Sequence, residues 1–279
     1  MKKKLLFLSA IILMNYGLTF AQEVELKDPS VYDFQSTLAP FSFSTTTLTP
    51  QDLPWSLAYA GSYGQQVSGP FGYDGVEQQV SVMGYLGGRF TLLAHAGLGF
   101  PRGNIINSAQ QVEVIRNFIG GKKYGGFRLG IGLGANHDYS NVISALGRVV
   151  ISYDQPRLKI AGNLLFEKAF AADRDKIDII TSLGVQYRIT TAFYAGLEAV
   201  GEDLEGLWNP QEAEGGARIL VGPSLNLVPN KSRFSFSLSG GPVMYATRSA
   251  ESNPTAIREL PFENGLTIRA RVIFKLSQN

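Results

Sequence analysis

Strict alternation of apolar residues with polar residues or glycine, over unusually long runs, is the feature that most restricts the fold of this chain. In residues 89–100 every even position is apolar, from Phe90 to Phe100, whereas the odd positions include Arg89, His95 and two glycines. A period of two residues is the signature of a β-strand. Runs of nine or more residues exceed the roughly 5–6 of a typical globular strand and match the roughly 9–11 needed to cross a bilayer.

Twelve segments of this kind follow residue 54, and the connections between them have two lengths. Tight links, such as 86–89 and 154–156, alternate with longer ones, such as 64–77 and 201–216. Antiparallel strands give this pattern when short turns lie at one end of a barrel and long loops at the other. The fourth segment, 110–119, has an ambiguous apolar face, but the alternation requires it. The predicted strands begin near Trp55, Gln78, Arg89, Gln110, Tyr124, Val142, Arg157, Lys176, Ala192, Ala217, Arg233 and Gly265.

This pattern resembles the outer-membrane β-barrel proteins of Gram-negative bacteria, over Trp55 to Phe274. The resemblance implies an all-β fold: an antiparallel transmembrane β-barrel of about 12 strands over residues 55–279, with short periplasmic turns and longer extracellular loops. It also implies three partners: outer-membrane lipid, lipopolysaccharide and the barrel-assembly machinery. The alternative is a soluble all-β sandwich. Long strands, arginines on the polar face and aromatic residues near strand ends favour the barrel.

Composition excludes several other classes. The chain has no cysteine, so disulfide scaffolds and cysteine-ligated metal sites are excluded. Charged residues make up 17% and the mean hydropathy is +0.02, so the chain is typical of neither a disordered protein nor a helical membrane bundle. A formal net charge of +2 is too balanced for a nucleic-acid-binding protein. Nothing in the sequence calls for a cofactor or a metal ion.

Residues 1–21 have the order of a secretory signal peptide. Lys2, Lys3 and Lys4 are followed by an apolar stretch from Leu5 to Met14, and Ala21 is a small residue at a suitable cleavage point. The apolar stretch is shorter than the roughly 20 residues of a membrane-spanning helix. We therefore expect export to the outer membrane. The three lysines belong to the signal, so the rest of the chain carries a net charge of −1.

If the apolar positions face lipid, the alternate positions face the lumen. Ten basic and three acidic residues then give the inner wall a net charge of +7, which favours anions. The predicted lumen-lining residues are the basic Arg89, Arg128, Arg148, Arg157, Lys159, Arg188, Arg218, Arg233, Arg269 and Arg271 and the acidic Glu167, Asp178 and Glu198.

Residues 22–54 form an acidic, proline-rich segment before the first strand. Five carboxylates against Lys27 alone give it a net charge of −4, and four prolines disfavour a regular helix or a central strand. One hypothesis is a partial plug that folds into the barrel and pairs with the lumen arginines. The other is a solvated periplasmic leader.

Glycines also share one side of two predicted strands. Gly97 and Gly99 on one strand, with Gly130, Gly132 and Gly134 on another, would leave a strip of the inner wall without side chains. Such a strip gives room to a solute or an inserted segment, or it eases the curvature of the strands.

The loop over 201–216 concentrates acidic residues around one tryptophan. Oxygen ligands can hold a divalent cation, and this loop could also contact a partner, but its spacing matches no EF-hand. A solvated outer loop is the alternative. The candidate residues are Glu202, Asp203, Glu205, Trp208, Glu212 and Glu214.

Catalysis has little support in the sequence. The run Asn136 to Asn141 contains His137, Asp138 and Ser140, and it faintly resembles the His-x-Ser-Asn run of outer-membrane phospholipases. Here the histidine and the serine fall in a tight loop with two residues between them, so we expect no enzyme.

Twelve strands make a barrel wider than the eight whose interior side chains fill, and narrower than the 16–18 of open porins. The sequence therefore predicts a narrow passive channel for small solutes, with anions favoured by the wall. Two alternatives are a non-conducting barrel whose outer loops bind an envelope or surface partner, and a lipid-modifying enzyme.

Overall fold

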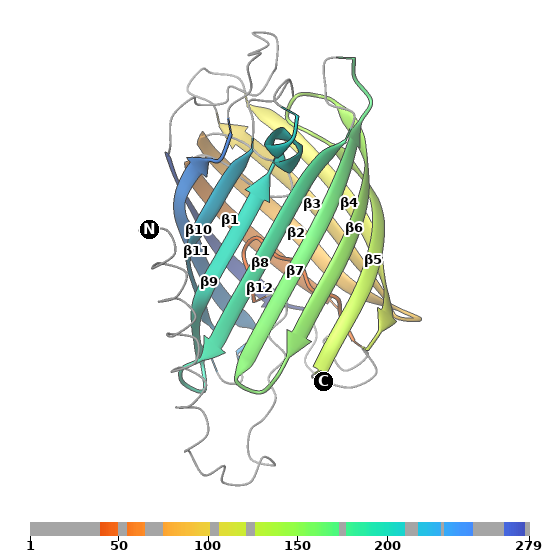
Figure 1. Cartoon of the computed structure of the whole chain (residues 1–279). Coiled ribbons are helices and arrows are strands. Elements are labelled where there is room, and N and C mark those ends of the chain that lie inside the picture. The colour runs from red at the N-terminus through yellow and green to blue at the C-terminus, as the bar shows by residue number, and fades with distance from the viewer. Residues whose placement is uncertain are drawn as a thin grey trace. The chain divides into compact units, whose positions relative to one another are not determined.

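A closed antiparallel barrel forms the body of the protein (Figure 1). The computed structural model describes residues 40–49, 55–64, 75–100, 106–120, 126–172, 177–209, 217–229, 232–247 and 265–276. These residues contain twelve strands: β1 (Trp55–Gly64), β2 (Gly75–Gly87), β3 (Phe90–Phe100), β4 (Asn107–Ile119), β5 (Gly126–His137), β6 (Ile143–Asp154), β7 (Leu158–Ala169), β8 (Asp178–Arg188), β9 (Phe193–Glu202), β10 (Arg218–Leu227), β11 (Phe234–Tyr245) and β12 (Gly265–Lys275).

Each strand pairs with its neighbours in the sequence, and β1 pairs with β12 to close the barrel. The closing register places Ser56 opposite Lys275 and Gly64 opposite Thr267. Closure leaves no sheet edge with unpaired backbone groups, which a strand in lipid cannot tolerate. In the described part of the chain no helix is long and apolar enough to span a bilayer.

The predicted all-β barrel is confirmed, and each of the twelve predicted strands is present. Predicted and observed starts differ by three residues at most, and the ambiguous fourth segment forms a full strand, β4. Long and short connections alternate along most of the chain. Around β5 they do not, because 120–125 and 138–142 are similar in length. The segments 1–21 and 210–216 lie outside the described residues, as do 22–39 and 50–54.

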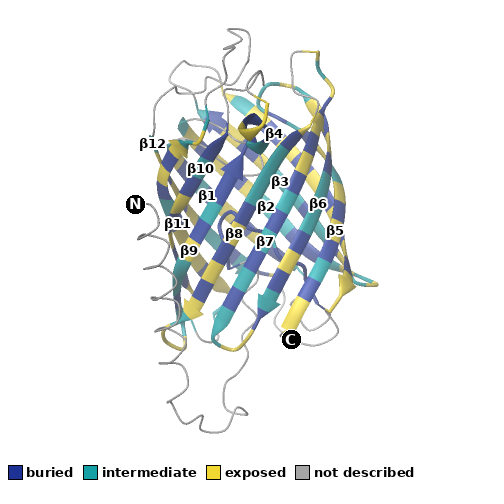
Figure 2. Ribbon diagram, viewed as in Figure 1, coloured by how far each residue is buried: buried dark blue, intermediate teal, exposed yellow. Residues whose placement is uncertain are grey.

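The alternation of the sequence becomes an alternation of environment. On β12, Leu266 and Ile268 are 51% and 44% exposed, whereas Thr267 and Arg269, at the alternate positions, are 0% and 3% exposed. Bands of buried and exposed residues follow the other strands in the same way (Figure 2). The exposed residues are apolar and the buried ones are largely polar, so the barrel has an apolar outer face and a polar lumen.

Residues 40–49 lie within the barrel and run across its lumen without regular secondary structure (Figure 1). Their backbone and side chains bond to β3, β4, β7, β8, β9 and β12. The segment therefore contacts the wall on several sides.

Close packing of glycines joins β10, β11 and β12. A Cβ on Gly222 would lie 1.9 Å from the carbonyl oxygen of Gly240, which is a backbone atom and cannot turn aside. We expect Gly222→Ala to destabilise the barrel by about 1–3 kcal/mol, as overpacking does. The matched control is Gly61→Ala on β1, since a Cβ there meets nothing within 4 Å.

Denaturant titration of the refolded barrel, followed by heat-modifiable migration on gels, measures this difference. Equal midpoints for Gly222→Ala and Gly61→Ala would contradict the packing argument.

Candidate functional site

The lumen is lined mainly by short polar side chains. Serines occupy the inner face of β11 at Ser235, Ser237 and Ser239, and all three are buried. Asparagine, glutamine and threonine continue this lining around the barrel, at positions such as Asn163 and Gln186. Such side chains leave room at the centre of the barrel, and residues 40–49 occupy part of it.

Six of the ten predicted basic residues lie within a strand, at a position that faces the lumen. They are Arg128, Arg148, Lys159, Arg218, Arg269 and Arg271.

The prediction is wrong for Arg89, Arg157 and Arg233, which lie in connections at the short-turn end. Arg89 has a φ of 70° in the β2–β3 turn and donates to the carbonyl oxygen of Phe118. Arg188 is the last residue of β8, and its guanidinium donates to the carbonyl oxygens of Thr190 and Thr191 in the next turn. Alternation does not show where a strand ends, because a residue in the adjoining turn can occupy the next alternate position in the sequence.

Acidic residues on the inner wall are more numerous than predicted. Of the three acidic residues in the prediction, Glu167, Asp178 and Glu198, each is buried on its strand. Sequence reasoning missed four others, although they have the same parity as the buried residues beside them. The described inward-facing acids are Glu77, Glu113, Asp154, Glu167, Asp178, Glu198 and Glu202, and the described inward-facing bases are Arg128, Arg148, Lys159, Arg188, Arg218, Arg269, Arg271 and Lys275. The two sets nearly balance, so the predicted wall charge of +7 is wrong.

Seven of these fifteen charged side chains form ion pairs with one another. Arg148 on β6 binds Glu113 on β4 through two nitrogens, with Nε–Oε2 and Nη2–Oε1 distances of 2.7 and 2.8 Å. Arg128 pairs with Asp154, which also lies 3.4 Å from Nζ of Lys159. A buried charge is costly unless it is paired, so these contacts allow charged side chains inside a narrow lumen.

The first part of the predicted acidic loop belongs to the wall rather than to solvent. Glu202 ends β9, and its carboxylate lies 3.0 Å from Nη2 of Arg218. Asp203 lies 3.3 Å from the same nitrogen. The short 3₁₀ helix η2 (Leu204–Leu207) then turns back over β8, where Glu205 accepts a hydrogen bond from the backbone N–H of Ile179.

Trp208 remains 65% exposed, and Glu212 and Glu214 lie outside the described residues. The described acids of this loop therefore serve packing and ion pairing. In the described residues no group of three or more acidic, histidine or cysteine side chains is suited to a metal ion.

The histidine–serine run forms the β5–β6 turn. The carboxylate of Asp138 accepts hydrogen bonds from the backbone N–H groups of Ser140 and Val142, and the ring of His137 contacts the side chain of Asn141. His137 therefore points to an amide rather than to the hydroxyl of Ser140, and Asp138 stabilises the turn.

The N-terminal segment is anchored most strongly at Glu198. Its carboxylate accepts hydrogen bonds from the backbone N–H groups of Ser42 and Phe43, at 3.1 and 2.7 Å, and from the hydroxyls of Ser224 and Ser239. Hydrogen bonds to a charged group are worth about 1.5–3 kcal/mol each. Glu198 was predicted as a lumen residue, but its role as an anchor depends on a segment far away in the sequence.

The rest of the segment is bound in the same manner, through its backbone. Asn163 accepts from the N–H of Thr45 and donates to its carbonyl oxygen, so its amide binds the segment as a neighbouring strand would. Asn117 donates to the carbonyl oxygen of Leu48, and Nη2 of Arg271 donates to that of Phe41 at 2.6 Å. At these positions the wall therefore satisfies the backbone groups of an extended segment that has no sheet partner.

Apolar side chains of the segment fill recesses in the wall. Leu48 joins an apolar cluster that includes Ile115, and Phe43 packs with Leu220 and other buried residues. Phe41 lies over Gly184, where a Cβ would come within 2.3 Å of its ring. Gly130, one of the predicted inner-wall glycines, makes similar room for Thr47. Gly130 and Gly184 therefore accommodate an inserted segment, and that segment is residues 40–49.

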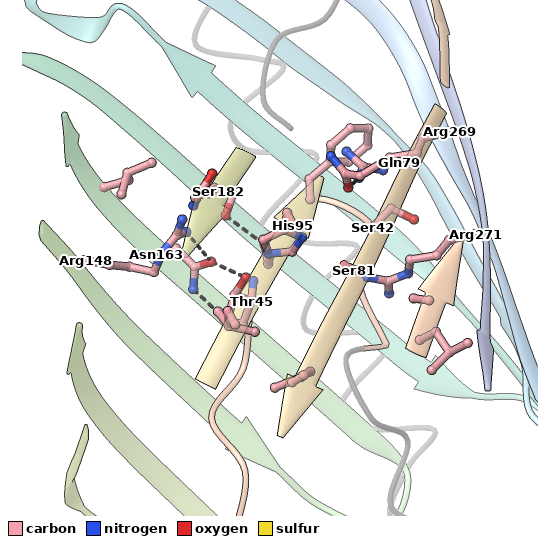
Figure 3. Close-up of a pocket in the computed structure, with 18 of the residues that line it drawn as sticks. Ser42, Thr45, Gln79, Ser81, His95, Arg148, Asn163, Ser182, Arg269 and Arg271 are labelled. Atoms are coloured by element: carbon pink, nitrogen blue, oxygen red, sulfur yellow. Dashed lines mark hydrogen bonds between the residues drawn. The ribbon is translucent and has the colours of Figure 1, made fainter. Parts of the chain in front are cut away.

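A small cavity remains beside the segment. It has a volume of about 80 Å³ and lies between Ser42–Thr45 and the walls formed by β1 to β4, β6 to β8 and β12. Arg148, Arg269, Arg271 and His95 line it, together with hydroxyl, amide and apolar side chains (Figure 3). None of its described lining residues is a carboxylate. Because Glu113 pairs with Arg148, the positive charge of the cavity comes from Arg269 and Arg271.

Solved structures with similar folds are outer-membrane barrels. A KdgM porin in complex with disordered oligogalacturonate superposes with a TM-score of 0.53 and 9% identity, over 80% of this chain and 99% of the other. A NanC porin gives a TM-score of 0.52 and 13% identity, over 79% of this chain and all of the other. No protein-family model matches the chain, and no curated protein sequence is similar to it. At these identities the likeness shows the fold, which is that of outer-membrane β-barrel proteins.

The anchoring of the segment by Glu198 can be tested by thiol labelling, because the chain has no cysteine of its own. Ser44→Cys places a thiol at a position that is 4% exposed. We expect Glu198→Gln to increase its rate of labelling by a polar maleimide by about tenfold or more, since charge-assisted bonds to the segment are lost.

Glu167→Gln is the matched control, because this buried carboxylate bonds to Asn136 on the wall. Equal labelling rates in the two variants would show that Glu198 does not anchor the segment.

Proposed function

We propose that this protein is an outer-membrane channel for small solutes, preferentially anions, with a passage that residues 40–49 constrict. The crossing of the lumen by this segment is the observation that carries the proposal. Residues 1–21 would direct export, and residues 50–54 would connect the segment to β1.

Three features support a channel rather than a solid barrel. The inner wall is polar and carries small side chains, as a water-filled passage requires. The segment is bound mainly through hydrogen bonds of its backbone, which water could replace. The two similar folds are porins, one of them in complex with an acidic oligosaccharide.

The predicted plug would pair its own carboxylates with lumen arginines, whereas the described segment contacts the wall in a different way. The carboxylates of 22–54 lie outside the described residues, and the described contacts of residues 40–49 with the wall involve backbone groups, hydroxyls and apolar side chains. One arginine, Arg271, takes part, and it donates to a carbonyl oxygen. The described segment contributes no charged side chain of its own, and the charged partners Glu198 and Arg271 belong to the wall and bond to its backbone.

Deletion of residues 22–54 tests the constriction. We expect the refolded truncated barrel to show a severalfold higher single-channel conductance in a planar bilayer than the chain that begins at residue 22, because the bonded segment no longer fills the lumen. Deletion of 22–38 alone leaves the described segment in place and should leave conductance unchanged. Equal conductance of all three forms would remove the proposal.

Preference for anions follows from the position of the arginines rather than from the total charge. The cavity beside the constriction contains three arginines and no described carboxylate, and a narrow site determines which ions pass. We expect the reversal potential in a salt gradient to show anion selectivity, which weakens as ionic strength rises.

Arg269→Gln should reduce this selectivity, whereas Arg233→Gln in an exposed turn should not. Cation selectivity of the unmodified protein would contradict the prediction.

A non-conducting barrel that binds a partner through its outer loops is a second candidate. The exposed side chains of Leu207 and Trp208 at the end of η2 favour it, since they lie next to each other on the long-loop rim. Absence of conductance in both the full and the truncated chain would favour this function over a channel.

A further inference from the structure

We propose that the cavity beside residues 42–45 is a binding site for one small oxyanion, such as inorganic phosphate or the carboxylate of a small acid. This rests on the proposed channel for the ligand's access to the lumen, and it adds a saturable site to a passage that would otherwise only attract anions. The site has two sides, the wall of the barrel and the N-terminal segment (Figure 3).

Arg269 on β12 is the central group. It is 3% exposed, and its Nε and Nη1 atoms have no hydrogen-bond partner among the described residues. Its Nη2 donates to the side-chain oxygen of Gln79, a neutral acceptor, and its guanidinium lies 6.0 Å from the ring centre of Phe43. The described residues place no carboxylate within ion-pair distance of Arg269. A buried guanidinium in this state requires an anion or water.

Three other residues that line the same cavity carry polar atoms without a partner among the described residues. These atoms are Nε2 of Gln79, Nδ1 of His95 and the hydroxyl of Ser42. Each can donate a hydrogen bond, His95 when Nδ1 carries the proton. Buried polar groups are normally satisfied, so a cluster of such groups around one cavity indicates a missing acceptor. An oxyanion supplies several acceptor atoms and a negative charge together.

The carboxylates at this level of the barrel are already engaged. Glu113 accepts from Arg148 and Gln111, and Glu198 accepts four hydrogen bonds from the segment and β10–β11 serines. Neither is among the lining residues of the cavity. If Glu113 or Glu198 moved to pair with Arg269, its present hydrogen bonds would break. A bound anion would neutralise Arg269 and leave those hydrogen bonds in place.

The size of the cavity limits the ligand. A volume of about 80 Å³ holds a few water molecules or an ion of a few heavy atoms, well below the roughly 300 Å³ or more of a pocket for a larger organic ligand. Ser42 and Phe43 close one side, so the ligand would contact the wall and the segment at once. The proposed site therefore selects a small oxyanion in the constricted state.

Binding can be measured on the refolded chain from residue 22 in detergent, without any conductance measurement. Isothermal titration with inorganic phosphate, and separately with acetate, at constant ionic strength should show one saturable site, and the melting temperature should rise with ligand concentration. Chloride at equal ionic strength is the control for screening. Failure of both oxyanions to bind would overturn the proposal, and binding only at a stoichiometry well above one would do the same.

Two substitutions locate the site. We expect Arg269→Gln to weaken binding about tenfold or more, because a charge-assisted interaction is lost, whereas Arg233→Gln should bind as the unmodified protein does. Gln79→Glu places a carboxylate where Arg269 already donates. It should raise the melting temperature in the absence of oxyanion and abolish the further rise on its addition. Unchanged binding in both variants would overturn the proposal.

The two proposals fail separately. If the barrel conducts but no oxyanion binds, the site is wrong and the channel stands. If an oxyanion binds at Arg269 in a barrel that does not conduct with or without residues 22–54, the channel is wrong and the lumen serves to hold a ligand.

Discussion

Closure of the sheet by the pairing of β1 with β12 is the constraint on which the rest of the structure depends. A strand in lipid has no water to satisfy its backbone, so the sheet must have no edge. Closure then divides the residues of each strand between lipid and an enclosed lumen. It also fixes where the N-terminal segment is attached, because Thr49 precedes the first residue of β1, Trp55, by only a few residues. A segment tethered so closely to the rim can enter the lumen at little cost in chain entropy.

An enclosed polar lumen has its own requirement, which residues 40–49 help to meet. Small side chains such as the serines of β11 suit a barrel wall, but they leave hydroxyls and carboxylates that need partners. The segment supplies backbone N–H groups to Glu198 and Asn163, and it receives donors at the carbonyl oxygens of Phe41, Thr45 and Leu48. Wall and segment therefore satisfy each other, which explains why an irregular segment has a defined place there.

The fold was largely predictable from the sequence, and the site was not. Strand number, order and inward parity follow from a local period of two, which residues such as Leu266 to Phe274 display directly. The ion pairs of Arg148 with Glu113 and of Arg218 with Glu202 depend on register across strands, which alternation alone does not give. Glu113 lies on β4, the strand with the least clear apolar face, so its inward position was missed and the wall charge was overestimated. The contacts of Phe41 with Gly184 and of Ser42 with Glu198 join residues more than 140 positions apart, and no local pattern records them.

The arrangement of charge along the barrel matters more than its sum. Glu77, Glu167, Asp178 and Glu202 lie near the ends of their strands at the long-loop rim. Arg269 and Arg271 lie at mid-strand beside the segment, at a level where Glu113 and Glu198 are already engaged by Arg148 and by the segment. Ions at the rim are screened by solvent within about a Debye length, while charges in the narrow middle are screened less. An anion that passes the acidic rim would therefore meet its strongest attraction at the constriction. Because Arg271 also donates a hydrogen bond to the carbonyl oxygen of Phe41, one of the groups that attract an anion also holds the segment. A bound anion would therefore affect the position of the segment.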